Sequence, residues 1–223
     1  RDDVESRGLG DVYKRQGNKF LANIRNTNAI IHVLRCFEND NITHVDGSID
    51  PVRDKGIIDT ELQLKDLETI ENRLAKTQKQ AVVGGDKQAK RAVEILLQYK
   101  AVLEQGLSAR TVELEKEDRK LVADLNLLTD KPVLYVCNVD EKSAVTGNEH
   151  TRAVEAAIAD ERAEMLIVAA ATEADIAELD EYEERQMFLE EIGLKESGVA
   201  RLIKAAYKLL DLQTFFTTGA DES

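Results

Sequence analysis

Four consecutive residues, Asn138-Val139-Asp140-Glu141, directly follow an apolar run that is typical of a buried strand. The carboxamide of Asn138 can donate and accept hydrogen bonds, so it could bond a purine base and also tie neighbouring loops together. An aspartate at the fourth position of such a motif could accept two hydrogen bonds from guanine. Glu141 stands at this position and is one methylene longer, so guanine specificity is not expected. Adenine presents a donor at N6 and acceptors at its ring nitrogens, and the backbone of Val139 could read that pattern. The motif predicts a base-binding site; the alternative is a plain turn at a strand end.

A second candidate lies at the end of a later apolar segment, where Ala169, Ala170 and Ala171 follow one another. Small side chains at this point would let backbone N–H groups approach a planar base. Ligands of open α/β sheets bind at the carboxyl ends of strands, and both motifs occupy such ends. We therefore expect Asn138 and Ala170 to lie close together. The alternative is that the alanines serve ordinary packing of a helix against the sheet.

A third candidate is a cluster of basic residues between positions 73 and 91, where six positive charges stand against the single negative charge of Asp86. Such a cluster on a projecting arm could contact the phosphates of RNA. The alternative is a solvated helix end without a partner. The positive residues are Arg73, Lys76, Lys79, Lys87, Lys90 and Arg91.

Strands and helices alternate along the chain, which predicts an α/β fold with a parallel sheet. The predicted strands are Ala29–Phe37, Lys131–Asn138 and Glu164–Ala171. Between the first two lie two helical series of apolar positions, separated by Gly84-Gly85. These series predict an antiparallel helical hairpin inserted into the sheet domain. Its two seams are Leu67, Ile70, Leu74, Thr77, Ala81 and Ala89, Val93, Leu96, Lys100, Leu103, Leu107.

Composition limits the class of protein. The net charge of −13 argues against a surface that binds nucleic acid throughout, although it allows a local basic patch. Cys36 and Cys137 have no metal-ligand spacing and are expected to be buried thiols of a reducing compartment. No apolar run reaches the roughly 18 residues of a membrane-spanning helix. Since no signal peptide is recognisable either, we expect a cytoplasmic protein without a membrane partner.

Long stretches of the chain resemble the YchF family of Obg-like ATPases. The resemblance extends from Gly17 to about Gly219 and includes the Asn138–Glu141 motif. The other stretches that carry it are Gly17–Leu21, Arg35–Val45, Gly84–Asp86, Glu173–Leu179 and Tyr207–Thr217.

The resemblance implies a P-loop NTPase-type sheet interrupted by a coiled-coil arm and followed by a TGS domain. It implies hydrolysis of ATP, often in preference to GTP, with Mg²⁺ as cofactor, and association with ribosomes in translation and stress responses. By position, Asn138 and Val139 would contact the base with Glu141 in support, Phe37 would pack near it, and Ala170 and Ala171 would line its other side. The possible contacts to ribosome or RNA are Lys76, Lys79, Lys87, Lys90 and Arg91.

The sequence also departs from the family pattern. It contains no G-x-x-x-x-G-K-[ST] motif, so we expect an internal fragment that is inactive alone, lacks the phosphate-binding loop and the Mg²⁺ ligands, and contains no catalytic residue. Residues 1–16 are expected to be a non-native or disordered leader. The expected organisation is then residues 17–57 and 130–211 as the two parts of the nucleotide-binding domain, 58–129 as the coiled-coil insertion, and 212–223 as the start of a TGS domain. The competing hypothesis is a nonenzymatic coiled-coil adaptor that binds ribosome or RNA.

Overall fold

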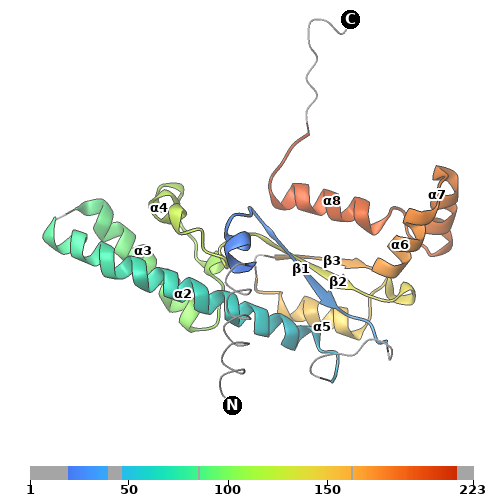
Figure 1. Cartoon of the computed structure of the whole chain (residues 1–223), viewed down its shortest axis with the longest axis horizontal. Coiled ribbons are helices and arrows are strands. Elements are labelled where there is room, and N and C mark those ends of the chain that lie inside the picture. Colours follow the sequence, from blue (N-terminus) through green and yellow to red (C-terminus); the bar gives the residue numbers. More distant parts are fainter. Residues whose placement is uncertain (1–19, 40–46, 85, 162, 215–223) are drawn as a thin grey trace, which may run out of the picture. The chain divides into compact units, whose positions relative to one another are not determined.

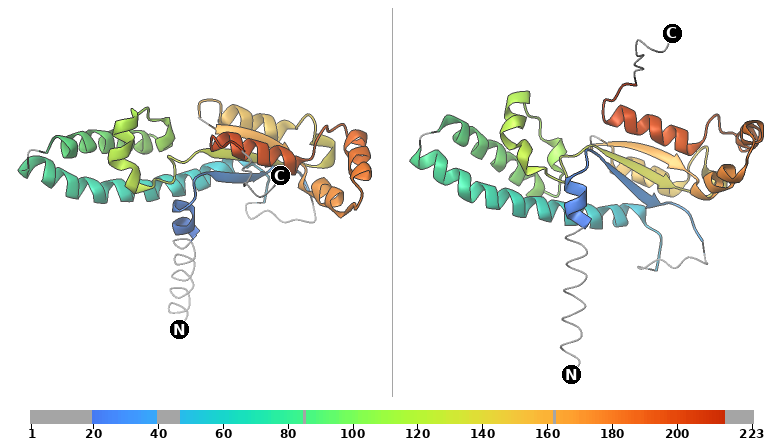
Figure 2. Two further views of the ribbon diagram at one scale, coloured as in Figure 1. Left: turned by 90° about the horizontal axis from the view of Figure 1, so that it is seen from above. Right: turned by 45° about the horizontal axis from the view of Figure 1, so that its top comes forward.

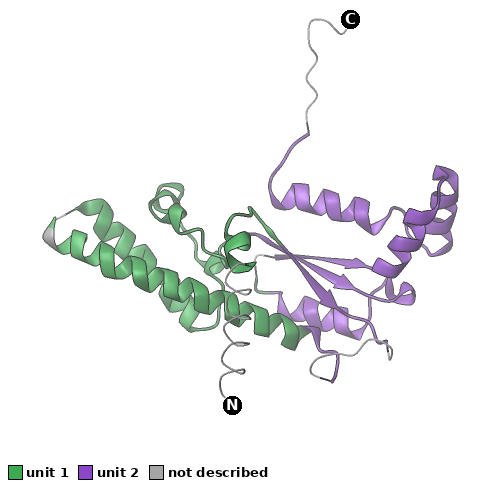
Figure 3. Ribbon diagram, in the orientation of Figure 1, with its two compact units in different colours: residues 1–30, 52–131, 160–162 green, residues 31–51, 132–159, 163–223 purple. Residues whose placement is uncertain are grey.

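The computed structural model describes residues 20–39, 47–84, 86–161 and 163–214, and it divides into two compact units (Figures 1 and 3). The first unit lies within Arg1–Ile30, Val52–Lys131 and Asp160–Arg162 and is helical. The second lies within Ile31–Pro51, Pro132–Ala159 and Ala163–Ser223 and holds the sheet. The predicted insertion, 58–129, falls inside the first unit, whereas the predicted leader, 1–16, lies outside the described residues.

Two long helices, α2 (Pro51–Val83) and α3 (Lys87–Glu104), dominate the first unit. Lys100 pairs with Glu71 at 2.6 Å, and Gln63 donates to the carbonyl of Gly106 at 2.9 Å. Moving back along α2 from Glu71 to Gln63, the partner moves forward along the chain from Lys100 to Gly106. The two helices are therefore antiparallel. Figure 2 shows them side by side in both views. This confirms the predicted hairpin.

The hairpin is held by an aliphatic core that follows the predicted seams. The side chains of Ile70, Ile95 and Leu96 are fully buried, and Tyr99 is almost so. Their burial stabilises the hairpin by roughly 1.5–3 kcal/mol for each side chain. One seam position is wrong: α3 ends at Glu104, and Leu107 is exposed. The buried core comprises Ile70, Leu74, Ile95, Leu96, Tyr99, Leu103, Ala109, Val112, Val122 and Leu127.

The chain returns from the hairpin through short helical elements. They are η1 (Ala109–Thr111), α4 (Lys116–Val122) and η2 (Ala123–Leu125). Asn126 adopts a left-handed conformation with φ 47°, which ends the helical path after η2.

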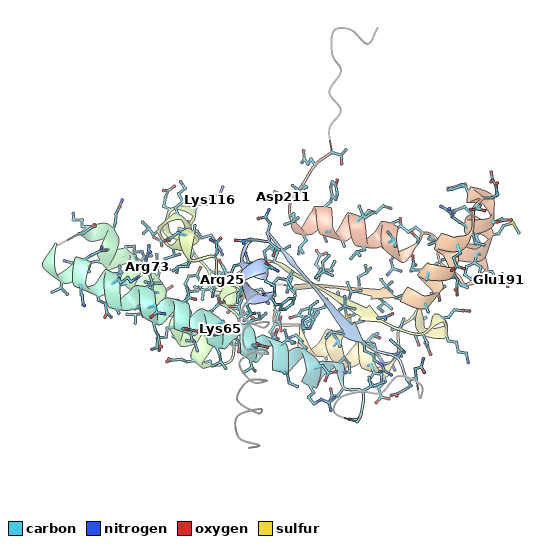
Figure 4. The ribbon with its side chains drawn as sticks, in the orientation of Figure 1. Arg25, Lys65, Arg73, Lys116, Glu191 and Asp211 are labelled. Atoms are coloured by element: carbon cyan, nitrogen blue, oxygen red, sulfur yellow. The ribbon has the colours of Figure 1, made fainter. Side chains whose placement is uncertain are left out.

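The carboxylate of Asp66, near the middle of α2, anchors this returning segment. Asp66 is fully buried and accepts hydrogen bonds from the backbone N–H groups of Leu128 and Thr129, at 2.8 and 2.7 Å, and from the Thr129 hydroxyl at 2.8 Å. Arg25, labelled in Figure 4, adds bonds to Thr69 and to the carbonyl of Leu125. The long helix is therefore tied to the residues that lead into the next strand.

The second unit is built on a three-stranded sheet with the order β1-β2-β3. Its strands are β1 (Ile30–Arg35), β2 (Val133–Asn138) and β3 (Ala163–Val168). β2 and β3 are parallel, with Val133 opposite Ala163 and Asn138 opposite Val168. The arrow of β1 runs the same way in Figure 1. The predicted α/β class with a parallel sheet and an inserted helical hairpin is confirmed.

Helices cover both faces of this sheet. A Cβ at Gly198, the first residue of α8 (Gly198–Leu209), would meet Val168, whereas a Cβ at Gly147, just before α5 (Glu149–Ala157), would meet Ile167. Successive strand residues point to opposite faces, so α8 and the start of α5 lie on opposite sides of β3. The remaining helices are α6 (Ala170–Glu178) and α7 (Tyr182–Glu191).

The predicted end of the third strand differs from the structure. β3 ends at Val168, and Ala170 already begins α6, so Ala170 and Ala171 form a first helical turn rather than a strand end. An extended Leu179 separates α6 from α7. The Leu179 carbonyl accepts a hydrogen bond from Nε of Arg185 at 2.7 Å, which stabilises this break.

Candidate functional site

Asn138 is the last residue of β2 and connects three segments of the second unit. Its side-chain Oδ1 accepts a hydrogen bond from the backbone N–H of Ala170 at 3.0 Å. Its backbone carbonyl accepts one from the N–H of Cys36 at 2.7 Å. Because the partner of the carboxamide is a donor, the oxygen must face Ala170 and the amino group must point elsewhere. The structure therefore brings together the ends of β1 and β2 and the start of α6.

The residues after Asn138 form a compact turn. The backbone N–H of Val139 donates to the carbonyl of Val168 at 2.9 Å, so this N–H belongs to the sheet ladder and only the carbonyl can face a ligand. The side chain of Asp140 accepts from the N–H of Ser143 at 3.0 Å and caps η3 (Glu141–Ser143). Glu141 is exposed on this short helix.

Ala170 and Ala171 are exposed in the first turn of α6. Whether this turn contacts a base stays a prediction. The hydrogen bond from the Ala170 N–H to Oδ1 of Asn138 places this turn beside the end of β2.

Phe37 follows Cys36 at the end of β1 and is half-buried. The guanidinium carbon of Arg35 lies 4.8 Å from the centre of the Phe37 ring, and its Nε donates to the Phe37 carbonyl at 3.2 Å. Nδ2 of Asn148, the N-cap residue of α5, donates to the Cys36 carbonyl at 2.6 Å. This contact fixes the backbone just before Phe37. Asn148 was not predicted from the sequence. It forms a capping box with Thr151 in the structure, but Asn-x-x-Thr lacks the Glu or Gln that marks such a box in a sequence.

The two cysteines, distant in sequence, are neighbours in this unit. Cys36 and Cys137 are fully buried free cysteines, so the prediction that both are buried thiols is confirmed. A hydrogen bond to Cys137, together with burial, raises the pKa of Cys36. Cys36 therefore stays protonated at neutral pH.

The basic residues near the hairpin turn are of two kinds. Lys76, Lys79, Lys87 and Lys90 are exposed; we call these four the tip lysines. Arg91 instead pairs with Asp118 at 2.6 Å and Glu94 at 2.7 Å, and these carboxylates raise its pKa. Arg73, labelled in Figure 4, pairs with Asp124 at 2.9 Å. Both arginine charges are thus partly compensated, and the tip lysines carry the positive field.

Comparison with known proteins places this arrangement in a family, although no protein-family model matches the chain. The "Ribosome-binding ATPase YchF" of Bacillus subtilis is 50% identical over 208 residues, and its counterpart from Escherichia coli O157:H7 is 47% identical over 206. Each match covers 92% of this chain. The chain belongs to the YchF family.

The solved Schizosaccharomyces pombe YchF GTPase has the same fold, with a TM-score of 0.80 at 28% identity over 92% of this chain. The chain spans 56% of the length of these YchF relatives. Within the described part of this YchF chain, no helix is long and apolar enough to cross a membrane.

Proposed function

We propose that this chain supplies the base-recognising part of a ribosome-associated nucleoside triphosphate hydrolase that acts on ATP and GTP. The printed names of the relatives, a ribosome-binding ATPase and a GTPase, support this class of activity. The observation that supports the site is the 3.0 Å hydrogen bond between Ala170 and Asn138, which joins the start of α6 to the end of β2.

The geometry favours adenine as the base. With Oδ1 of Asn138 engaged by Ala170, its Nδ2 remains to donate to a ring nitrogen. The N–H of Val139 is used by Val168, so its carbonyl is left to accept from the amino group at N6. Glu141 supports the turn, while Phe37 and the Ala170–Ala171 turn line opposite sides of the ring. A donor and an acceptor in this order match adenine.

We further propose that Mg²⁺ accompanies the bound nucleotide, with no ligand assigned among the described residues. In that part of the chain no group of three or more His, Cys, Asp or Glu side chains could hold a metal ion. The described residues therefore do not fit a metal centre by themselves. We also propose that residues 58–129 form the coiled-coil insertion and that residues 212–223 begin a TGS domain.

Ribosome association is proposed to involve the tip lysines. Four exposed ammonium groups at one end of the hairpin form a local positive field on an otherwise acidic chain. Such a field favours the phosphates of RNA and is weakened by salt. Arg91 could join the contact only by giving up its two carboxylate partners.

Binding and hydrolysis can be tested separately. ATP and GTP are titrated into the ¹⁵N-labelled chain and into its Asn138→Ala variant, with Asn72→Ala, on an exposed position of α2, as the matched control. Losing the Asn138 contacts should weaken ATP binding by roughly 1–3 kcal/mol, about 5- to 150-fold. Hydrolysis is measured in a chimaera in which this chain replaces the matching segment of the Bacillus subtilis relative.

Each outcome of these experiments supports a different conclusion. Weaker ATP binding by Asn138→Ala, with Asn72→Ala unchanged and an active chimaera, would support the proposal. Equal binding by all three chains would remove Asn138 from the site. An inactive, folded chimaera that still co-sediments with ribosomes would favour the nonenzymatic adaptor instead.

A further inference from the structure

A carboxylate in the first turn of α6 is bonded to the start of another helix. Oε1 of Glu173 accepts from the N–H of Gly198 at 2.6 Å, and Oε2 accepts from the N–H of Val199 at 3.3 Å. Ser197 caps the same helix, α8, by accepting from the N–H of Ala200 at 3.2 Å. The first backbone donors of α8 are therefore satisfied partly by a residue of α6, and its negative charge suits a helix N-terminus.

The start of α8 lies close against the Glu173 and Val168 side chains, so a larger residue at position 198 would displace them. A Cβ at Gly198 would lie 2.8 Å from Oε1 of Glu173 and 2.9 Å from Cγ1 of Val168. α8 is also held to β3 on the same side, since Nη2 of Arg201 donates to the Ile167 carbonyl at 2.8 Å. Glu173 thus bonds to a helix that is itself fixed to the sheet.

The same turn of α6 carries the contact to Asn138. Glu173 donates its own backbone N–H to the carbonyl of Ala169 at 3.0 Å, and the next residue, Ala170, donates to Oδ1 of Asn138. Within one helical turn, one end is therefore bonded to α8 and the other to the end of β2. A shift of this turn would move Ala170 relative to Asn138.

We infer that Glu173 is a positioning residue for base recognition: it fixes the first turn of α6, and through the Ala170 amide it sets the orientation of the Asn138 carboxamide. This inference rests on the proposed base site. It assigns Glu173 no contact with the nucleotide. Its effect should therefore depend on Asn138 being present.

The inference is tested on the ¹⁵N-labelled chain by NMR. Hydrogen exchange of the Ala170 amide is measured without ligand, and ATP affinity is measured by titration. Glu173→Ala removes the clamp, and Glu173→Asp keeps the charge but shortens the side chain by one methylene. Glu173→Gln retains an acceptor for Gly198, and Asp175→Ala removes an exposed carboxylate from the same helix as the matched control.

We expect Glu173→Ala and Glu173→Asp to accelerate Ala170 exchange and to weaken ATP binding at least fivefold. Glu173→Gln should change both less than Glu173→Asp does, because its side-chain oxygen can still accept from Gly198, and Asp175→Ala should change neither. In the Asn138→Ala background, Glu173→Ala should have no further effect on ATP affinity. A general loss of stability would instead add to the effect of Asn138→Ala.

Failure of this inference can be distinguished from failure of the proposed function. Unchanged Ala170 exchange in Glu173→Asp, or additive losses of affinity in the double variant, would overturn the positioning role while leaving the base site intact. If Asn138→Ala alone leaves ATP binding unchanged, the base site itself is wrong, and the inference built on it falls as well. Glu173→Asp keeps the test decisive if Glu173→Ala does not fold.

Discussion

The backbone N–H of Ala170 lies 3.0 Å from Oδ1 of Asn138, and this contact closes the rim at which the ends of β2 and β3 meet. Asn138→Asp separates the two functions of the carboxamide. A carboxylate can still accept from Ala170, but it has no donor for a ring nitrogen. We expect this variant to keep the melting temperature of the parent within a few degrees and to lose ATP affinity about tenfold or more, as for a lost buried hydrogen bond.

Calorimetric titration with ATP and thermal unfolding, performed on the same samples, check this prediction. A variant that binds ATP as well as the parent does would show that Asn138 acts only as a structural link. A variant that unfolds early would show that the Ala170 contact needs a neutral partner.

The buried carboxylate of Asp66 should stabilise the hairpin unit. In Asp66→Asn an amide NH₂ would face N–H or O–H donors, because only one side-chain oxygen remains to serve three hydrogen bonds. We expect a loss of roughly 1–3 kcal/mol in the free energy of unfolding. Denaturant unfolding measures it, with Asp180→Asn at an exposed position as the control. Equal midpoints for the two variants would contradict the prediction.

The same carboxylate should make stability depend on pH. Burial raises the pKa of Asp66 above its ordinary value, against the opposing effect of its hydrogen bonds to Thr129 and Leu128. Between the ordinary pKa and the raised one, the folded state binds more protons than the unfolded state, so this contribution to stability falls as pH rises. The stability difference between parent and Asp66→Asn should therefore narrow with rising pH across that window. Unfolding free energies measured from pH 3.5 upward test this, and a difference that widens would show a lowered pKa.

The hairpin core provides a matched pair of substitutions on one helix. Ile95 on α3 is fully buried, whereas Leu97, two residues later, is 47% exposed. Ile95→Ala should cost about 2–5 kcal/mol of unfolding free energy, because it leaves a cavity as well as losing apolar contact. Leu97→Ala should cost about 0.5 kcal/mol or less. Urea titrations of both variants check the contrast, and similar losses would mean that the two helices do not pack as described.

Charge reversal tests the tip lysines. Changing Lys76, Lys79, Lys87 and Lys90 to glutamate should lower co-sedimentation of the chimaera with ribosomes at least about tenfold at moderate salt, and the residual binding should depend less steeply on salt. The control reverses four other exposed lysines, Lys116, Lys120, Lys195 and Lys204, which gives the same net charge. Equal losses in both variants would indicate a nonspecific effect of charge.

Patterns of local origin were predicted well from the sequence. The apolar runs predicted the three strands of the described residues, and heptad-like spacing predicted Ile70, Leu74 and Leu96 as core positions. Both predictions succeeded because the periodicity of a strand or a helix depends only on residues that are close in sequence. The order of the motifs also led to the expectation that Asn138 and Ala170 lie close together. The base-binding role of these residues remains a prediction.

Contacts between distant segments could not be read in this way. The sequence does not distinguish Asp66 from other polar residues of a long helix. Its role depends on the hydrogen bond from Thr129, which lies 63 positions later in the chain. Glu173 and Gly198 are likewise unremarkable alone, and the proximity of Cys36 to Cys137 depends on strand register. Such contacts are fixed by tertiary packing, which overrides the local preferences that a single sequence displays.

The anchoring of α2 at Asp66 has a mechanical consequence. The helix continues for 17 residues from Asp66 to Val83, a reach of about 25 Å at 1.5 Å per residue. A force applied at the far end acts on this anchor as on the pivot of a lever. The hydrogen bonds of Asp66 would pass such a load to the backbone of Leu128 and Thr129, within the same unit.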